Sequence, residues 1–381
     1  MEELEEYLPR LQDIEEILKL YPPAKHIIEE SLGNLENQDN LLESLLLRMW
    51  EFINTGKFSE VPGHFRQIYS ICCFFLIYQK LLSRVVNFEE SYELLDKAIL
   101  IGSTENLYSK AEQFIEKVSK FLDKSFEKDG IIDFLEIPIL EHKNLKCDVS
   151  IENCPSIDRF CSQYFLPEKP VLIKNALEHW PALTKWRDIN YLYKTAGNRT
   201  IPVEIGSNYT SENWSQELLK LKTFLVHQFS SKGIENVEYL AQHDLFDQVP
   251  DLAKDFSIPE YCLLGNSENI DIKAWLGPKG TVSPLHQDPK HNILCQVFGS
   301  KKIILAAPKD TKYLYPFEGR FLNNTSSVDV ENIDFEKYPL AREVEFLTLT
   351  LQEGECLYIP VKWWHFVKSL TKSFSVSFWF E

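Results

Sequence analysis

Two stretches decide the fold of this chain: SPLHQD at residues 283–288 and YIPVKWWH at residues 358–365. These two stretches supply His286, Asp288 and His365. Two histidines and one carboxylate, the first two ligands separated by one residue, form the ligand set of a facial iron site that leaves coordination positions open. We therefore interpret the trio as a metal site that activates oxygen.

The spacing of the first two ligands has a physical reason. Side chains alternate faces along a β-strand, so His286 and Asp288 point the same way and can grip one ion. The third ligand must come from another strand, and His365 follows an apolar, aromatic-rich run that is typical of one. Taken alone, the motif favours a surface hydrogen-bonded pair of His286 and Asp288 with His365 as a histidine satisfied in the core.

The sequence between the ligands strengthens the metal interpretation. The β-prone runs 292–298 and 301–305 flank Gly299-Ser300, a pattern that predicts a β-hairpin. The returning strand would start at Lys301 and bring it back toward the ligands. A buried cation there could hold the distal carboxylate of a dicarboxylic acid, although a lysine at a strand start is usually solvated.

These residues resemble the JmjC family of Fe(II)- and 2-oxoglutarate-dependent oxygenases, in which a lysine lies fifteen positions after the first histidine, as it does here. The similarity covers roughly residues 132–381. It includes PVLIKNALEHWPA at residues 170–182, YLAQH at 239–243 and FSVSFW at 374–379. The resemblance implies a double-stranded β-helix, a cupin-like jelly roll, as the catalytic domain.

The resemblance also implies roles for individual residues. Fe(II) would be held by His286, Asp288 and His365, with 2-oxoglutarate and O2 as cosubstrates. Lys301 would pair with the 5-carboxylate of 2-oxoglutarate. The same cosubstrate would be contacted by Tyr239 and Ser283, with Asn292 near its iron-bound end.

The activity implied by the resemblance is hydroxylation of a protein side chain, most simply arginine. Demethylation of histone methyl-lysine and cleavage of histone tails are alternatives of the same family type. A guanidinium pairs with a carboxylate and stacks on an aromatic ring. Glu204 and Trp275 are our candidates for these two roles. Either residue could instead be purely structural. Two other classes stay open: a non-oxidative isomerase, and an inactive barrel that serves as an interaction scaffold.

Composition limits the possible partners. The formal net charge of −17 argues against direct nucleic-acid binding and would attract a basic protein substrate. The longest apolar run, residues 71–78, is far shorter than the ~20 residues that cross a bilayer, and we find no targeting run. We expect a soluble intracellular protein with no membrane contact. The resemblance implies the nucleus as the location, with the cytoplasm as the alternative.

The eight cysteines contain no Cys-x-x-Cys pair. Cys147, Cys154 and Cys161 recur every seven residues, so a zinc site with His142 is conceivable. Small buried hydrophobes in a reducing compartment are the simpler interpretation.

The hydrophobic period predicts an α+β protein with two domains. Residues 1–130 form an all-helical domain that could bind a partner protein, and residues 131–381 form the catalytic domain, with its JmjC core at about 238–381. A boundary is expected near Gly130. Within the second domain, helical excursions are expected around Trp186 and at residues 215–219. The strands are expected at residues 272–274, 293–297, 303–306, 346–351, 356–359 and 374–380.

Overall fold

The structure is a computed structural model of the 381-residue chain. It describes residues 2–33, 41–55, 60–82, 88–104, 107–125, 133–139, 146–206, 214–231, 233, 236–265, 270–318 and 323–381. The chain divides into two compact units, the first made of Met1–Ile131 with Asn198–Thr200 and the second of Ile132–Gly197 with Ile201–Glu381. The expected boundary residue, Gly130, lies outside the described residues.

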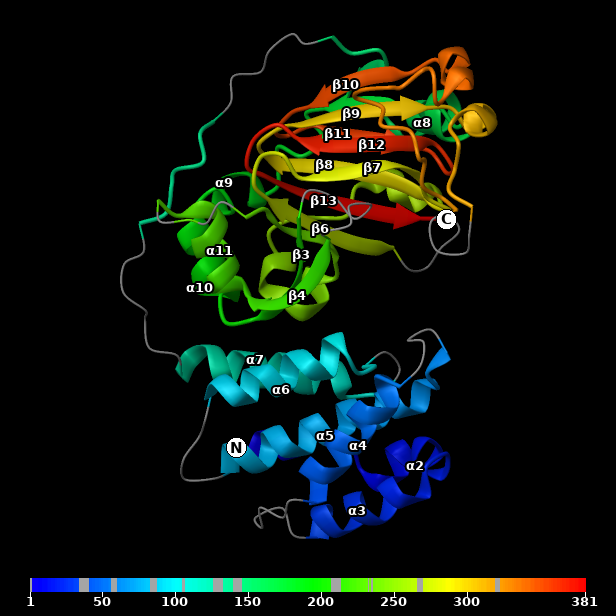
Figure 1. Ribbon diagram of the computed structural model, residues 1–381. Coiled ribbons are helices and arrows are strands. Elements are labelled where there is room, and N and C mark those ends of the chain that lie inside the picture. The colour runs from blue at the N-terminus through cyan, green and yellow to red at the C-terminus, as the bar shows by residue number, and fades with distance from the viewer. Residues whose placement is uncertain are drawn as a thin grey trace. The chain divides into compact units, whose positions relative to one another are not determined.

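The regular elements described between residues 2 and 125 of the first unit are helices (Figure 1). Its central element is α5, which is apolar around nearly its whole circumference and buries most of its side chains against neighbouring helices. No described helix is long and apolar enough to cross a membrane. The helices are α1 (Glu2–Glu5), α2 (Leu11–Lys19), α3 (Pro22–Gly33), α4 (Leu41–Ile53), α5 (Gly63–Leu82), α6 (Phe88–Leu100) and α7 (Ala111–Ser125).

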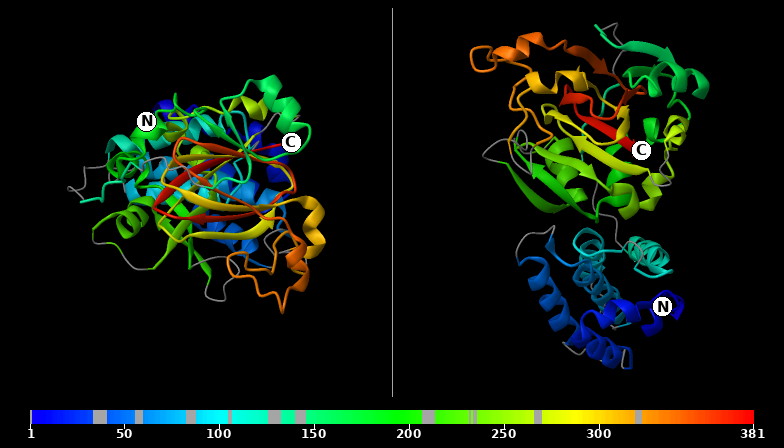
Figure 2. Two further views of the ribbon diagram at one scale, coloured as in Figure 1. Left: turned by 90° about the horizontal axis from the view of Figure 1, so that it is seen from above. Right: turned by 90° about the vertical axis from the view of Figure 1, so that its right-hand side faces the viewer.

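The second unit is built on two sheets that face each other (Figures 1 and 2). The larger sheet has the order β1-β2-β11-β8-β13-β6-β5-β3-β4, and the smaller has the order β10-β9-β12-β7. This arrangement confirms the predicted cupin-like jelly roll. The strands are β1 (Ser150–Asn153), β2 (Val171–Lys174), β3 (Thr200–Ile205), β4 (Ser215–Lys220), β5 (Glu238–His243), β6 (Asp271–Gly277), β7 (Val282–Gln287), β8 (His291–Phe298), β9 (Lys301–Ala306), β10 (Leu347–Leu351), β11 (Cys356–Ile359), β12 (Trp364–Ser369) and β13 (Ser373–Phe380).

Helices cover the outer face of the larger sheet and close the main core of this unit. Trp186, for example, stacks on Phe374 of β13 with ring centroids 4.5 Å apart. The expected helical excursion around Trp186 is present as two short helices. The helical elements described in the second unit as a whole are α8 (Ile157–Phe160), η2 (Cys161–Phe165), α9 (Ala182–Lys185), α10 (Ile189–Ala196), α11 (Leu221–Phe229), α12 (Leu245–Gln248), α13 (Pro250–Ala253), η3 (Glu260–Leu264), η4 (Pro308–Tyr313) and η5 (Pro339–Glu343).

Side-chain alternation decides which residues of each strand face the space between the sheets. On β8, Cys295 and Val297 join the outer core, whereas Leu294 joins a separate cluster between the sheets. On β9, Ile303 and Leu305 belong to that inner cluster. Lys301 has the same parity as these two residues, so the strand directs its ammonium inward.

The predicted hairpin at Gly299-Ser300 is wrong. The two runs are strands, but β8 pairs with β11 and β13, whereas β9 pairs with β10 and β12 in the other sheet. The turn therefore carries the chain across the barrel from one sheet to the other. Both strands have an apolar inner face. These faces are buried better when the strands lie opposite each other across a core than when they pair edge to edge.

The predicted helix at residues 215–219 is also wrong. This segment is strand β4, at the edge of the larger sheet, and helix α11 starts directly after it. Local helix propensity is weak, and pairing with β3 overrides it.

The turn at Gly299 yields a stability prediction. Gly299 has φ +77°, and a Cβ there would lie 2.1 Å from the Lys372 carbonyl oxygen. Gly299→Ala should therefore lower the free energy of unfolding by about 2–4 kcal/mol. Gly280→Ala is the matched control, because Gly280 has φ +94° with nothing within 4 Å, and should cost about 1 kcal/mol. Equal losses in denaturant titrations of the two variants would contradict this account of the turn.

Candidate metal centre

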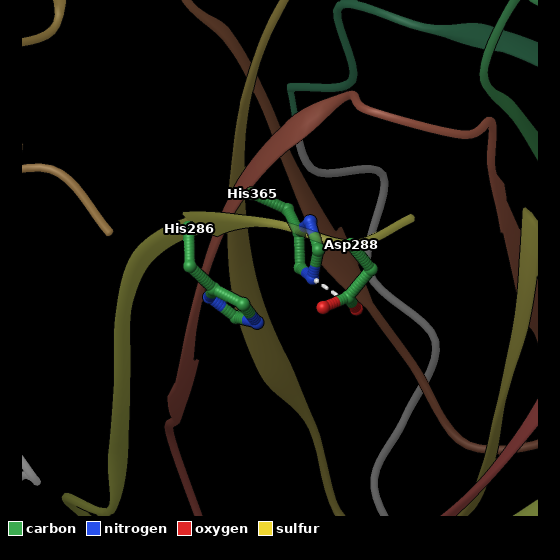
Figure 3. A group of neighbouring side chains, drawn as sticks. All are labelled: His286, Asp288 and His365. Carbon is green, nitrogen blue, oxygen red and sulfur yellow. Dashed lines mark ion pairs between the residues drawn. The ribbon is translucent and has the colours of Figure 1, made fainter. Parts of the chain in front are cut away.

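Two neighbouring strands of the smaller sheet bring the three predicted ligands together. His286 on β7 and His365 on β12 are direct register partners, and Asp288 follows the end of β7. Their ligand atoms all lie within 4.8 Å of one another, and no other such group of three was found among the described residues. Figure 3 shows the two imidazoles and the carboxylate around one common space.

A bulge in β7 places a fourth residue on the same wall. The register of β12 against β7 shifts between His365, which faces His286, and Val367, which faces Ser283. Strict alternation would send residues three apart to opposite faces, but the shift lets both Ser283 and His286 line the pocket. The intervening Leu285 is buried in the outer cluster of the smaller sheet.

Backbone carbonyls fix the orientation of both imidazoles. Nδ1 of His286 lies 2.7 Å from the carbonyl oxygen of Pro284, and Nδ1 of His365 lies 3.0 Å from that of Trp363. A carbonyl can only accept, so each Nδ1 carries a proton, and in the neutral form of either ring Nε2 then keeps the free lone pair. His365 Nε2 lies 3.5 Å from Asp288 Oδ2, the dashed contact in Figure 3. This tautomer is the one that metal-ligating histidines use when a carbonyl holds the other nitrogen.

The electrostatics of the trio suit a cation. Burial, reinforced by the nearby His365, lowers the pKa of His286 to about 4, so this ring is neutral at physiological pH. Burial raises the pKa of Asp288, but the two histidines outweigh it and the net pKa is below the usual value. Oδ2 of Asp288 is buried and accepts no hydrogen bond from the described residues. An ionised carboxylate with an unused oxygen, beside two imidazoles that are both oriented by backbone carbonyls, fits a divalent metal ion.

Lys301 is a second unusual group in the same pocket. It is 1% exposed, and no carboxylate of the described residues pairs with it. Burial alone lowers its pKa to about 7. Its Nζ lies 3.4 Å from the hydroxyl oxygen of Tyr239, a weak contact. A buried ammonium without a counter-charge is costly, and an anionic ligand would relieve that cost.

The pocket contains most of the residues predicted from the sequence, and some that were not. Its lining includes Tyr239, Trp275, Ser283, Asn292 and Lys301 as well as the three ligands. Strand parity could have identified the remaining members except Ser377, because each of the others lies two residues from a predicted one or faces one across a strand pair. These further lining residues are Leu294, Ile359, Val367, Ser377 and Trp379.

Two predicted residues need separate description. Trp275 donates its indole N–H to Ser377 Oγ at 2.8 Å, and its ring centroid lies 6.2 Å from that of Tyr239. Glu204 is not among the residues that line the pocket. It is the register partner of Tyr239 on the adjacent strand β3, and burial raises its pKa. Glu204 therefore lies one strand beyond the pocket wall.

Comparison with known proteins agrees with this architecture. A cupin-like domain family matches residues 157–381. The chain is 45% identical to "Jumonji C domain-containing protein 5" of Drosophila melanogaster, with 100% of this chain and 98% of the relative covered. It is 40% identical to "Lysine-specific demethylase 8" of Danio rerio (87% and 85% covered) and 39% identical to "Lysine-specific demethylase JMJ30" of Arabidopsis thaliana (87% and 83%).

The site predicts metal-linked stability. Co(II) or Mn(II) at one hundred times its dissociation constant should stabilise the protein by about 2.7 kcal/mol, seen as a rise in melting temperature. Asp288→Ala should abolish this rise, because the carboxylate is the one anionic ligand of the trio. Asp251→Ala, which removes a surface partner of Lys254, is the control and should keep it. A full metal response in Asp288→Ala would exclude Asp288 as a ligand.

Proposed function

This chain belongs to the JmjC family of Fe(II)- and 2-oxoglutarate-dependent oxygenases, and on that basis we propose that it hydroxylates an arginine side chain in a protein substrate. The convergence of two imidazoles and one ionised carboxylate on a common point carries this proposal. When bound, Fe(II) with 2-oxoglutarate and O2 supplies the oxidising power that inserts oxygen into an unreactive C–H bond.

The residues around the trio fit the cosubstrate. Lys301 offers a buried positive charge for the 5-carboxylate of 2-oxoglutarate. Tyr239 and Ser283 present hydroxyl groups to the same cavity. Asn292 is 5% exposed, and its Oδ1 accepts no hydrogen bond from the described residues, so its amide remains available near the metal end. The apolar side chains of the lining exclude water from the ion and from Lys301.

The chemistry beside Tyr239 favours arginine as the substrate residue. Glu204 is a partly buried carboxylate whose pKa burial raises, and a guanidinium would stabilise its charged form. Trp275 lies on the other side of Tyr239 and is held by its bond to Ser377. A carboxylate and an indole on the two strands that flank Tyr239 match the planar, delocalised charge of arginine better than a compact ammonium.

Demethylation of methyl-lysine is the second candidate, and the names of two relatives favour it. It needs the same metal, cosubstrate and oxidant, and differs only in the carbon attacked. An inactive scaffold is disfavoured, because all three ligands and Lys301 are present and oriented. A non-oxidative isomerase would leave Lys301 without a purpose.

The setting of this activity is part of the same proposal. The substrate would be a basic protein, attracted by the net charge of −17. We place the protein in the nucleus, with the cytoplasm as the alternative, and we assign a partner-binding role to the helical unit. Neither direct nucleic-acid binding nor membrane contact is expected.

A peptide panel tests the reaction. The purified protein is incubated with Fe(II), 2-oxoglutarate and matched peptides that carry arginine, lysine or methyl-lysine, and succinate and peptide masses are measured. We expect succinate release coupled to the gain of one oxygen on the arginine peptides. Loss of a methyl group from methyl-lysine peptides would favour demethylation instead. A protein that retains iron but releases no succinate with any peptide would refute the oxygenase proposal.

Lys301 controls the predicted cosubstrate affinity. Lys301→Ala should weaken 2-oxoglutarate binding by about 10- to 150-fold, because one charge-assisted hydrogen bond is lost. In the parent the free lysine has a pKa of about 7 and must be protonated to pair, so affinity should fall by up to about tenfold per pH unit above 7. Binding titrations from pH 6.5 to pH 9 would measure both effects.

The pH effect should vanish in Lys301→Ala. The neighbouring Lys302→Ala is the control, because Lys302 points to the outer face and pairs with Glu331 at 3.0 Å. Unchanged affinity in Lys301→Ala would show that the 5-carboxylate binds elsewhere.

Glu204 is predicted to select the substrate. Glu204→Gln should lower kcat/KM for an arginine peptide by about 10- to 150-fold, since a charged hydrogen bond to the guanidinium would be lost. Release of succinate in the absence of peptide should stay at the parent level. Glu217→Gln is the control because Glu217 is exposed on β4. Equal activity of both variants toward the arginine peptide would remove Glu204 from the substrate site.

A further inference from the structure

The turn between β11 and β12 supports two of the three metal ligands. The backbone N–H of Lys362 donates to the carbonyl oxygen of Asp288 at 2.9 Å, and the carbonyl oxygen of Trp363 accepts from His365 Nδ1 at 3.0 Å. Lys362 has φ +61°, a conformation that non-glycine residues adopt only where their surroundings hold them. Residues 360–363 therefore set the position of one ligand through its backbone and of another through its ring.

His291 connects this turn to the larger sheet. It is the first residue of β8, and its Nδ1 lies 2.9 Å from the hydroxyl of Tyr358 and 3.3 Å from the backbone nitrogen of Val361. A backbone N–H can only donate, so Nδ1 of His291 must be unprotonated and accept. The Tyr358 hydroxyl then also donates to Nδ1. One nitrogen of His291 thus accepts from a residue of β11 and from a residue of the turn.

The surroundings of His291 hold it in this neutral form. Its ring lies between the side chains of Phe165, Tyr358 and Phe380, at centroid distances of 4.9, 5.9 and 5.5 Å. Burial lowers the pKa of His291, and Glu168 opposes that in part. Burial raises the pKa of Tyr358, so its phenol keeps the proton that it donates.

We infer that His291 is a positioning residue for the metal centre: through Val361 it fixes the turn that orients Asp288 and His365. His291 does not itself contact the ligands. It acts through the turn, whose Lys362 N–H and Trp363 carbonyl form hydrogen bonds with Asp288 and His365. Loss of its acceptor would leave the Val361 N–H without a partner and free the turn to shift. This inference rests on the proposed metal function of the trio.

Metal affinity of the folded protein is the measurement that tests it. The probe is Co(II), titrated into metal-free protein and followed by its ligand-field absorption, whose bands report coordination geometry. His291→Phe keeps an aromatic ring but removes the acceptor, and should weaken Co(II) binding by about tenfold with altered bands. His291→Asn places an amide oxygen near the position of Nδ1 and should restore affinity to within about threefold of the parent.

Two outcomes would overturn the inference. One is a folded His291→Phe protein with the affinity and bands of the parent, which would show that the ring only fills space. The second outcome applies if His291→Phe fails to fold. His291→Asn is then compared with His291→Gln, whose amide reaches the position of Nε2, and equal Co(II) affinity of the two would refute a role for the Nδ1 acceptor. A parent that binds no Co(II) would instead refute the metal centre.

Discussion

The burial of charged and polar groups without protein partners is the constraint on which this structure depends. Lys301, the free oxygen of Asp288 and the amide oxygen of Asn292 all lie in one pocket. The two oxygens accept no hydrogen bond from the described residues, and buried Lys301 has only a weak contact with Tyr239. Each such group costs free energy in the ligand-free protein. The apolar clusters on both sides of the larger sheet must offset that cost, and a metal ion with a dicarboxylate would remove it. The same imbalance that destabilises the empty pocket is therefore a source of affinity for its ligands.

A jelly roll suits this requirement because it separates structural and functional positions by parity. Along β12, Trp364 and Phe366 pack into the outer cluster, while His365 faces the metal. Along β9, Ile304 packs outward and Lys301 faces in. One strand can thus carry core residues and reactive residues in alternation. Neither set has to compromise the packing of the other.

The same parity explains what could be predicted from the sequence. The three candidate ligands follow from residue type and spacing, and each of the six strands with expected bounds lies within about three residues of them. Lys301 was expected near the ligands because of a hairpin, but the parity of β9 is what directs it into the pocket. The hairpin was wrong because a turn signal shows where the chain reverses and says nothing about which sheet receives the next strand. The bulge at Pro284 could not be predicted either, because it arises from the register between β7 and β12. Edge strand β4 was mistaken for a helix because pairing with β3 decides its conformation.

The contacts that orient the ligands could not be predicted from the sequence for a related reason. A motif records the side chains that touch an ion, but the carbonyls that select their tautomers belong to other residues, Pro284 and Trp363. Trp363 lies in a turn whose shape depends on Lys362 at positive φ and on an acceptor at the start of β8. Because ligand geometry must be held to within a fraction of an ångström, indirect contacts of this kind typically change metal affinity by about 10- to 100-fold. Residues of this kind have to be found from hydrogen-bond direction: a backbone N–H that ends on an imidazole nitrogen fixes the protonation of that ring and thereby reveals its structural role.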